Sequence, residues 1–412
     1  MAIDAVVRAR QPAKGDAELP SPDEQDAVRT AARRAAAQLG RAVVRARLSM
    51  AAARERARRD AFFRGIWLAA ATQLDLHARS LGGSLVEIEL HDQTLRISRG
   101  SCSLEEPAAL DRAGDKPLMH QLLRELGIPT PRHQVITLDS LDRATPFLGP
   151  RPGCVVKPAK DGSGGRGVTT NIRDVAGLRI AAAAAAAAAA RASRASRGRA
   201  GAGVLGRVGA KFAELRTVPL LVEEQVPGHN YRLLYLDGEL VDAVRRANPY
   251  VVGDGGATVA QLIDRLNEQR STSVVERGGA TVTRDADMRA TLATQDLGYA
   301  SVPEPGRRVV LKTAVNEGAI ADQIPAIDEL CPEIIRQGAI AATVAGTRLV
   351  GVDVITDDPA APLSWARGRI LEVNTTPGLA YHYHRHPGQI HVTHAILQRL
   401  RHPETRSGPP TT

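Results

Sequence analysis

A glycine-rich loop and a lysine stand close together in the first half of the chain. The loop reads Gly-Ser-Gly-Gly-Arg-Gly at 162–167, and Lys157 ends the apolar run that begins at Cys154. Backbone N–H groups in such a loop can approach a phosphate closely, and a neighbouring ammonium adds positive charge. Val168-Thr-Thr follows and favours a strand, whereas a dinucleotide-binding loop leads into a helix. We interpret residues 162–167, the glycine loop, as a phosphate-binding hairpin, with a plain surface hairpin as the alternative.

Three oxygen-bearing side chains occur in apolar strands further along. Asp353 stands between valines, and Glu372 and Asn374 alternate with apolar residues near the end of another run. Alternation places Glu372 and Asn374 on one face of their strand. Two carboxylates and an amide oxygen are ligands suited to Mg²⁺ (or Mn²⁺) bound together with phosphates. The alternative for each carboxylate is a buried, paired structural residue.

The hydrophobic pattern predicts the elements that must hold these residues. Helical spacing predicts helices within 25–79, at 116–126, over the alanine run that ends at 190, at 259–266 and at 333–344. Apolar or alternating runs predict one hairpin at 85–98, a second around Asp237-Gly238, and strands at 154–157, 220–224, 349–355 and 369–374. Residues 270–308 show no regular pattern. The mixture predicts an α+β protein.

Composition suggests where the chain divides. We expect a flexible arm at 1–24, a helical and hairpin region at 25–112, a main domain at 113–400 and a disordered tail at 401–412. Within the main domain, 153–224 forms a subdomain with an Ala/Arg-rich insertion at 175–211. We interpret the Arg/Ser/Gly part of this insertion as a solvated loop, with a tether for RNA or an acidic partner as the alternative.

Charge and composition exclude several classes of function. The net charge is +9, but residues 1–71 hold 14 basic against 8 acidic residues, and residues 191–216 hold 7 against 1. The rest of the chain is therefore net negative, and aromatic residues make up only 3%, which argues against nucleic acid as the partner. We expect no transmembrane helix, because no unbroken apolar run reaches 18 residues, and no signal peptide, which places the chain in the cytoplasm. Three widely separated cysteines predict no disulfide framework.

Six blocks of sequence, taken together, carry a resemblance to a known family. The following motifs occur in family order and resemble those of the ATP-grasp ligases: Asp115-Lys116, Val156-Lys157-Pro158, the glycine loop, Val222-Glu223-Glu224, Gly351-Val-Asp353 and the run from Glu372 to Gly378. The runs that start at Asn248, Leu297 and Val309 are similar to the ATP-grasp portion of cyanophycin synthetases. The likeness covers about residues 113–395. It implies an ATP-grasp fold of three α/β subdomains, with 153–224 as the lid and no counterpart of the Mur-ligase-like half of those synthetases.

The resemblance implies a nucleotide site. Lys116 and Lys157 would contact the ATP phosphates. The lid hairpin would close over them through its loop residues Gly162, Ser163, Gly164, Gly165 and Gly167. Glu223 and the backbone of Glu224 to Val226 would read the adenine edge. Asn230 would meet the ribose, at a position that is commonly acidic in the family.

The resemblance also implies a reacting centre. Asp353, Glu372 and Asn374 would hold Mg²⁺, and Arg232 and Arg246 would lie near the transferring phosphate or the acceptor carboxylate. His382 would face the substrate. His384 and His386 alternate with it, so a zinc site is an alternative, although no cysteine or acidic residue adjoins them.

The implied function is an ATP- and Mg²⁺-dependent ligase that joins a carboxylate to an amine through an acyl phosphate. The substrates would be amino acids or small peptides, and homo-oligomerisation is left open. Such chemistry needs no enzyme nucleophile, only cations and a closing lid that keeps water away. One alternative is a nucleotide-binding regulator or scaffold without turnover, which we would expect to have lost one of the three metal ligands. The other is a basic nucleic-acid-binding protein.

Overall fold

The computed structural model describes residues 49–50, 52–91, 93–99, 101–149, 152–160, 165–196, 214–273, 279–375, 377–383 and 392–401. The following predicted features lie outside these residues: the arm at 1–24, Gly162, Ser163, Gly164, part of the insertion (197–211), His384, His386 and the tail beyond 401. The chain divides into two compact units, residues 1–56 and residues 57–412, and the description below concerns the second. The predicted boundaries at 24, 112 and 400 stay predictions.

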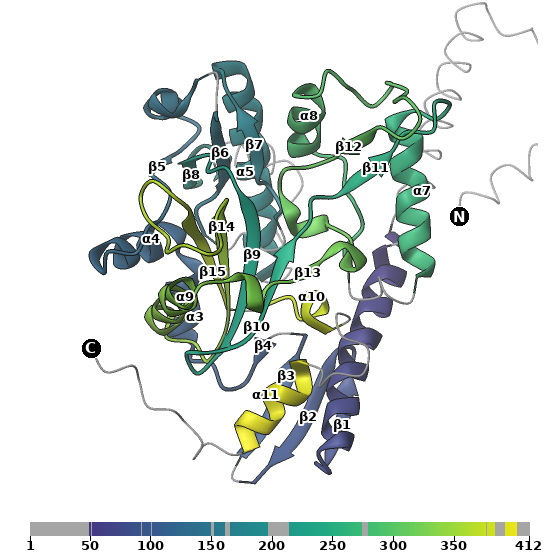
Figure 1. The fold of residues 1–412 in the computed structure, drawn as a ribbon, viewed down its shortest axis with the longest axis vertical. Coiled ribbons are helices and arrows are strands. Elements are labelled where there is room, and N and C mark those ends of the chain that lie inside the picture. Colours follow the sequence, from purple (N-terminus) through teal and green to yellow (C-terminus); the bar gives the residue numbers. More distant parts are fainter. Residues whose placement is uncertain are drawn as a thin grey trace, which may run out of the picture. The chain divides into compact units, whose positions relative to one another are not determined.

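A five-stranded antiparallel sheet, the central sheet, occupies the middle of this unit (Figure 1). Its strands, in spatial order, are β13 (Ile324–Pro325), β10 (Glu239–Arg246), β9 (His229–Leu236), β14 (Leu349–Thr356) and β15 (Arg369–Asn374). The predicted hairpin joins β9 to β10, because Asp237 and Gly238 both have positive φ, at 51° and 82°. A two-residue turn of that kind matches the twist of the paired strands.

Helices cover one face of the central sheet. They are α3 (Pro107–Gly114), α4 (Lys116–Glu125) and α9 (Pro332–Ala345). Alternate residues of β9 and β14, among them Tyr231, Leu233, Val350 and Val352, are fully buried against them. The intervening residues point to the opposite face, because successive side chains of a strand alternate. That opposite face holds the polar residues singled out above.

A four-stranded antiparallel sheet, the outer sheet, follows α4. Its order is β5 (His133–Ile136), β8 (Leu220–Glu224), β6 (Cys154–Pro158) and β7 (Thr169–Ile172). One face is covered by α5 (Val175–Ser196) and by the 3₁₀ helix η1 (Leu141–Phe147). Four alanines of α5 (181, 182, 185 and 186) are fully buried there, so the alanine run allows a close approach of helix to sheet. Lys157 and Glu223 belong to the face away from α5, since their neighbours Val156 and Val222 face α5.

The apolar helix α5 bears on the expectation that the chain has no transmembrane helix. By length and composition alone its Val175–Ser193 part could cross a membrane, with a mean hydropathy of 1.4. A search for unbroken apolar runs missed this helix, because Gly177, Arg179 and Arg191 interrupt the apolar stretch around the alanines. An average hydropathy over a window is not sensitive to such breaks. A core helix passes the same test, and the buried alanines of α5 face the outer sheet.

Residues 247–323, the connecting segment, join β10 to β13. Four elements lie in it before its last turns: the paired strands β11 (Tyr250–Val252) and β12 (Arg308–Val310), and the helices α7 (Val259–Thr272) and α8 (Ala286–Ala293). Helix α7 begins with a capping box in which Thr258 and Gln261 bond reciprocally. Helix α8 lies in the stretch for which no regular structure was predicted. Asp285 caps it, but its sequence, Ala-Asp-Met-Arg-Ala-Thr-Leu-Ala, has almost no amphipathic pattern.

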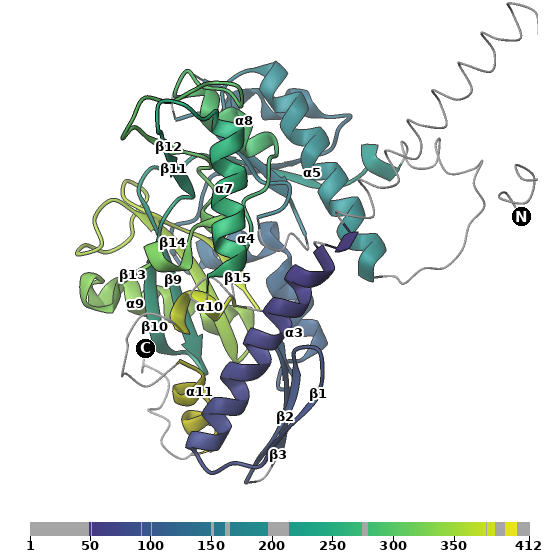
Figure 2. The same cartoon turned by 90° about the vertical axis from the view of Figure 1, so that its right-hand side faces the viewer.

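The N-terminal part of the unit packs as a separate layer. A helix at 57–73 lies beside a sheet of β1 (Ala78–Gly82), β2 (Leu85–Leu90), β3 (Gln93–Ser98) and β4 (Ser101–Cys102), and α11 (Val392–Arg401) packs against the same core (Figure 2). The predicted hairpin is β2–β3, and β1 and β4 extend it. Short turns complete the fold: η3 (Val315–Glu317), η4 (Ile320–Asp322), η5 (Ile327–Glu329) and α10 (Ala380–Tyr383). Helices and antiparallel sheets are mixed along the chain, so the predicted α+β class is confirmed.

Candidate active site

Strand register brings the predicted cationic and metal-binding residues together on the face of the central sheet opposite α3, α4 and α9. Asp353 on β14 lies opposite Arg232 on β9 and opposite Glu372 on β15. Asn374 lies two residues beyond Glu372, and Arg246 lies on β10 two residues beyond the partner of Arg232. The residues are far apart in sequence, and only the strand order β10-β9-β14-β15 places them side by side.

A buried ion-pair network forms the centre of this cluster. Arg232 donates through Nε and Nη2 to the two oxygens of Asp353, and Arg246 Nη1 lies 3.5 Å from Oδ2 of the same carboxylate. Burial alone would lower the pKa of Arg232, but the ion pair raises it above its ordinary value. Burial would likewise raise the pKa of Asp353, yet the two arginines hold it below its ordinary value. Arg232 and Asp353 therefore both stay charged at neutral pH.

The metal-binding prediction concerns Asp353, Glu372 and Asn374. Asn374 donates through Nδ2 to Asp353 at 3.3 Å, which leaves its Oδ1 as an acceptor, and Glu372 is half-buried. Among the described residues no group of three or more His, Cys, Asp or Glu side chains forms a metal site; the predicted set has two carboxylates and an amide. Oxygen donors on adjacent strands suit Mg²⁺, although the arginines already engage Asp353. The residues present fit the ion, with Glu372 as the more open carboxylate.

Arg246 has two further neighbours that the sequence did not indicate. Its Nη2 donates to Oδ1 of Asn316 at 2.6 Å, and its guanidinium lies 5.0 Å from the centre of the Tyr381 ring. The Tyr381 hydroxyl donates to the backbone oxygen of Asn316 at 2.6 Å. The Arg246 side chain is only 2% exposed, so these contacts fix its orientation.

His382 lies in α10, on the same side of the central sheet. Its Nδ1 is 2.7 Å from Oδ2 of Asp242, a residue of β10 that shares a face with Arg246. The imidazole is buried, and the structure places it beside the Asp242 carboxylate. A carboxylate on Nδ1 fixes the tautomer and orientation of a histidine. Its substrate-facing role stays a prediction.

The face of the outer sheet that points away from α5 holds a second pair. Lys157 Nζ lies 2.8 Å from Oε2 of Glu223, and both side chains are buried. His120 of α4 adjoins them, with Nδ1 3.7 Å from the Glu223 carboxylate and Nε2 2.9 Å from the backbone oxygen of Leu371. Burial lowers the pKa of His120 to about 4 from its ordinary 6.5. The histidine is therefore neutral at pH 7, and Lys157 is the cation that neutralises Glu223.

This shifted pKa predicts an acid sensitivity. A histidine with a lowered native pKa binds its proton more readily when unfolded, so stability is full above pH 6.5 and is lost as pH falls toward 4. Between pH 7 and pH 4, the free energy of unfolding of the wild type should fall by about 2–3 kcal/mol more than that of His120→Gln, as measured by urea unfolding. A control, His77→Gln, removes an exposed imidazole and should leave the pH dependence in place. Equal losses in wild type and His120→Gln would contradict the assignment.

Lys116 is the first residue of α4 and lies beside the strand that carries Lys157. Its backbone N–H donates to Ala159 at 3.3 Å, directly after β6. Asp115 caps the helix through the N–H of Leu118 and pairs with Lys160. No ion-pair partner of the Lys116 ammonium is found in the described part of the chain. The two predicted phosphate-binding lysines thus come from adjoining elements.

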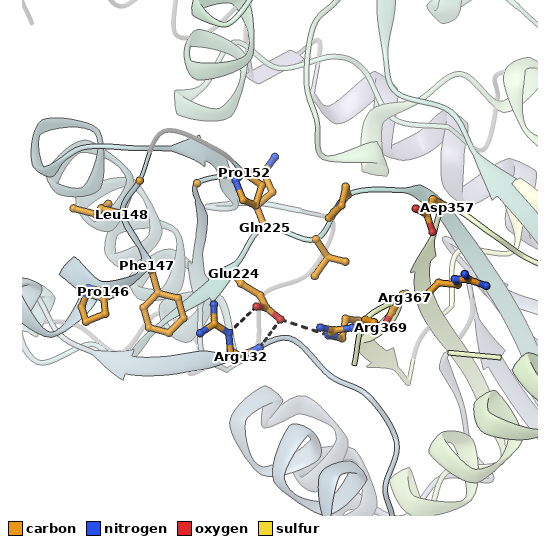
Figure 3. A pocket seen from close by; sticks show the side chains of 16 residues that line it. Arg132, Pro146, Phe147, Leu148, Pro152, Glu224, Gln225, Asp357, Arg367 and Arg369 are labelled. Atoms are coloured by element: carbon orange, nitrogen blue, oxygen red, sulfur yellow. Dashed lines mark hydrogen bonds and ion pairs between the residues drawn. The ribbon is translucent and has the colours of Figure 1, made fainter. Parts of the chain in front are cut away.

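The hinge residues 223–226 present different groups to the two faces of the outer sheet. Glu224 points away from Glu223 and is held by Arg132, whose Nε lies 2.8 Å away, and by Arg369 at 3.4 Å (Figure 3). A cavity of about 270 Å³ adjoins Glu224. It is lined also by Phe147, Pro152 and the residues from Gln225 to Pro227. The adenine contact predicted for Glu223 and for the backbone of Glu224 to Val226 stays a prediction. Asn230, at the start of β9, is half-buried opposite Arg246.

The described end of the glycine loop explains two of its glycines. Gly165 and Gly167 have φ of +71° and +77°, a region that side chains rarely adopt. A Cβ on Gly167 would lie 2.6 Å from the Cβ of Ala188 on α5, and one on Gly165 would lie 2.3 Å from Nδ2 of Asn316. The glycines permit close approach to α5 on one side and to the connecting segment on the other.

Comparison with known proteins finds relatives that are similar in sequence. No family model matches it. Cyanophycin synthetase from Trichormus variabilis is 29% identical over 279 residues, which is 66% of this chain and 27% of that protein. The glutathione biosynthesis bifunctional protein GshAB from Streptococcus mutans is 30% identical over 189 residues, which is 44% of this chain and 24% of that protein. The chain is a relative of the ATP-grasp ligases.

This ATP-grasp relative spans about a quarter of the length of the curated relatives it matches. Among solved structures, the bifunctional glutathione synthetase from Pasteurella multocida aligns with a TM-score of 0.49 at 18% identity, over 83% of this chain and 43% of that one. The predicted resemblance to ATP-grasp ligases, near cyanophycin synthetase, is thereby confirmed by sequence similarity.

Sequence reasoning missed four residues of this ATP-grasp relative's candidate site: Asp242, Asn316, Tyr381 and His120. Two of them had a usable signal, because Asp242 alternates with Arg246 on β10 and Tyr381 adjoins His382. His120 lies on the buried side of α4, and no sequence pattern distinguishes it from a core residue. Asn316 lies in a turn with no pattern, and only its contact with Arg246 reveals it.

Proposed function

We propose that the chain is an ATP- and Mg²⁺-dependent ligase that joins the carboxylate of an amino acid or small peptide to an amine. The observation that supports this most is the cluster of Arg232, Arg246, Asp353, Glu372 and Asn374 on one sheet face. It combines fixed cations for a transferring phosphoryl group with oxygen donors for a metal. The similarity to cyanophycin synthetase and to GshAB supports the same class of substrate. A cytoplasmic location belongs to this proposal.

The reaction would proceed in two steps. The substrate carboxylate attacks the γ-phosphorus of ATP, which releases ADP and forms an acyl phosphate; the amine then attacks the acyl carbon, releasing phosphate and a proton. Lys116 and Lys157 would contact the nucleotide phosphates, and the buried guanidinium of Arg246 would stabilise charge on the transferring group. Asp353, Glu372 and Asn374 would hold Mg²⁺ or Mn²⁺, which when bound neutralises phosphate charge. The glycine loop would exclude water from the acyl phosphate.

One observation favours the alternative of a nucleotide-binding regulator without turnover. Asp353 is engaged by two arginines, as in a structural ion pair, and so is less open to a metal than the other ligands. In that case ATP would bind without being consumed. The two functions differ in a single measurable quantity, substrate-dependent ADP release.

The deciding experiment is a screen of amino acids and dipeptides for release of ADP and phosphate. We expect one carboxylate and one amine together to stimulate release, with an amide product of matching mass. Excess chelator should abolish it, since the predicted ligands of the cation are all oxygens. Tight ATP binding with no turnover for any pair would support the regulator instead, and full activity in chelator would contradict the metal assignment.

A further inference from the structure

The cavity beside Glu224 lies on the side of the outer sheet to which Val222 also points. This cavity, the hinge cavity, has a volume of about 270 Å³ and is lined by residues 132, 146–149, 152–153, 224–227, 357 and 366–369 (Figure 3). Of the described residues of the predicted nucleotide site, only Glu224, Gln225 and Val226 line it. The hinge cavity is therefore separate from the predicted phosphate and metal sites.

Much of the lining of the hinge cavity is apolar. The apolar side chains are those of Pro146, Phe147, Leu148, Pro152, Val226 and Pro227. In Figure 3, Phe147 and its neighbours lie on one side of Glu224, while Asp357 and Arg367 lie on the other. Such a lining favours a ligand with an apolar body, because contact removes apolar surface of both partners from water.

The charged part of the lining has an excess of positive charge. Three arginines (132, 367 and 369) and two acids (224 and 357) line the cavity, so its formal net charge is +1. Glu224 lies between two of the arginines, 2.8 Å from Arg132 Nε and 3.4 Å from Arg369 Nε. Burial alone would raise the pKa of Glu224, but these arginines hold it below its ordinary value, so the carboxylate is ionised at neutral pH. The remaining single positive charge suits a monoanion better than a phosphate dianion.

Two of these arginines offer hydrogen-bond donors to a ligand. Arg369 donates through Nη1 and Nη2 to three backbone oxygens of residues 364–368, which fixes its guanidinium. Its Nε is buried and makes no hydrogen bond within the described part of the chain, and a buried donor is rarely left unpaired. The Arg132 side chain is 77% exposed, and no described residue hydrogen-bonds to its Nη groups. Guanidinium N–H groups are well matched to the two oxygens of a carboxylate.

From these observations we propose that the hinge cavity is a binding site for a small carboxylate with an apolar body, such as an apolar amino acid. The carboxylate would bind to Arg132 and to Nε of Arg369, and the apolar body would lie against Phe147 and the prolines. Sites for drug-sized molecules usually measure about 300–1,000 Å³. The volume of about 270 Å³ therefore suits a ligand of amino-acid size rather than a nucleotide.

The first test measures binding to the full chain without ATP. 3-Phenylpropanoate and L-phenylalanine carry a carboxylate on the same apolar body, and 2-phenylethylamine carries only an ammonium. A ligand-observed NMR titration should give a Kd of about 5 mM or tighter for at least one carboxylate, and binding at least about 10-fold weaker for the amine. A preference for L-phenylalanine would identify an amino acid as the ligand, and a preference for 3-phenylpropanoate a simple carboxylic acid. Failure of both carboxylates to bind, or equal binding of the amine, would overturn the proposal.

The second test assigns the bound carboxylate to the hinge cavity. Arg132→Ala removes donors of the carboxylate and should raise its Kd about 10-fold or more. Phe147→Ala removes apolar contact and should raise it about 5-fold or more, with urea unfolding as the check on folding. Arg143→Ala is the matched control, because Arg143 is exposed on the same 3₁₀ helix as Phe147 and does not line the cavity. Wild-type affinity in Arg132→Ala, whose replaced side chain is exposed, would overturn the proposal.

Competition with a nucleotide separates the hinge cavity from the predicted nucleotide site. Saturating ADP with Mg²⁺ should leave the Kd of the carboxylate within about 3-fold, whereas displacement by ADP would overturn the proposal. None of these measurements depends on turnover. The hinge-cavity site and the proposed ligase activity can therefore fail independently of each other.

Discussion

Replacing Lys157 by alanine is expected to lower turnover about 30- to 1000-fold, which corresponds to roughly 2–4 kcal/mol of lost charge stabilisation. The ammonium is buried on the face of the outer sheet that points away from α5, where it lies 2.8 Å from Glu223 Oε2. During phosphoryl transfer, negative charge grows on the phosphates of the departing ADP. The Lys157 ammonium would stabilise this charge in a site with little water. Its removal also leaves the Glu223 carboxylate buried without its counter-charge, so ATP affinity and stability should both fall.

Lys157→Arg should not restore activity. A guanidinium is broader than an ammonium, and the buried lysine head already lies 2.8 Å from Glu223. The chain uses arginine for 48 of its 54 basic residues, so the lysine itself marks a position where the smaller cation is needed.

The control for Lys157 is its neighbour Lys160. Its side chain is 62% exposed and pairs with Asp115 at the surface, so Lys160→Ala should keep turnover within about 3-fold. Turnover and nucleotide affinity are measured for the three variants. Wild-type behaviour of Lys157→Ala or Lys157→Arg would exclude Lys157 from the phosphate site.

The parts of the fold that sequence predicted well are those fixed by local chemistry. The Asp237-Gly238 turn set the β9–β10 hairpin, because both residues tolerate positive φ. The largely apolar run of β14 predicted a buried strand, and its one charged residue, Asp353, stood out for that reason. Alternation then placed Glu372 and Asn374 on one face. Each of these inferences needs only a few consecutive residues.

The parts that sequence could not predict depend on register and on distant packing. Strand order decides that Asp353 meets Arg232 and Glu372, which are 121 and 19 positions away along the chain. Helix α8 has no apolar stripe to reveal it, since it packs through Met288 and Leu292 while also burying Asp287. Asn316 reaches Arg246 across 70 residues. The roles of the site residues stay predictions for the same reason, because proximity does not establish chemistry.

Asp353 and Glu372 provide the second large expected effect, because the structure gives these two predicted metal ligands unequal structural roles. Asp353 is buried between Arg232 and Arg246, so Asp353→Ala leaves two buried guanidiniums without their carboxylate. Breaking a buried ion pair from one side costs about 3–5 kcal/mol of unfolding free energy. We expect Asp353→Ala to lose activity and stability together.

Glu372 is half-buried and supplies no ion pair to the described structure, so Glu372→Gln should change the free energy of unfolding by less than about 1 kcal/mol. If it holds a cation, activity should nevertheless fall by at least about 100-fold, as for a lost electrostatic contact in the transition state. Urea unfolding and turnover, measured on both variants, separate the two roles. A stable Asp353→Ala variant would remove the ion-pair argument, whereas an active Glu372→Gln variant would remove the metal argument. We expect both variants to lose activity and only Asp353→Ala to lose stability. That result would mean that Asp353 holds the arginines and Glu372 holds the cation.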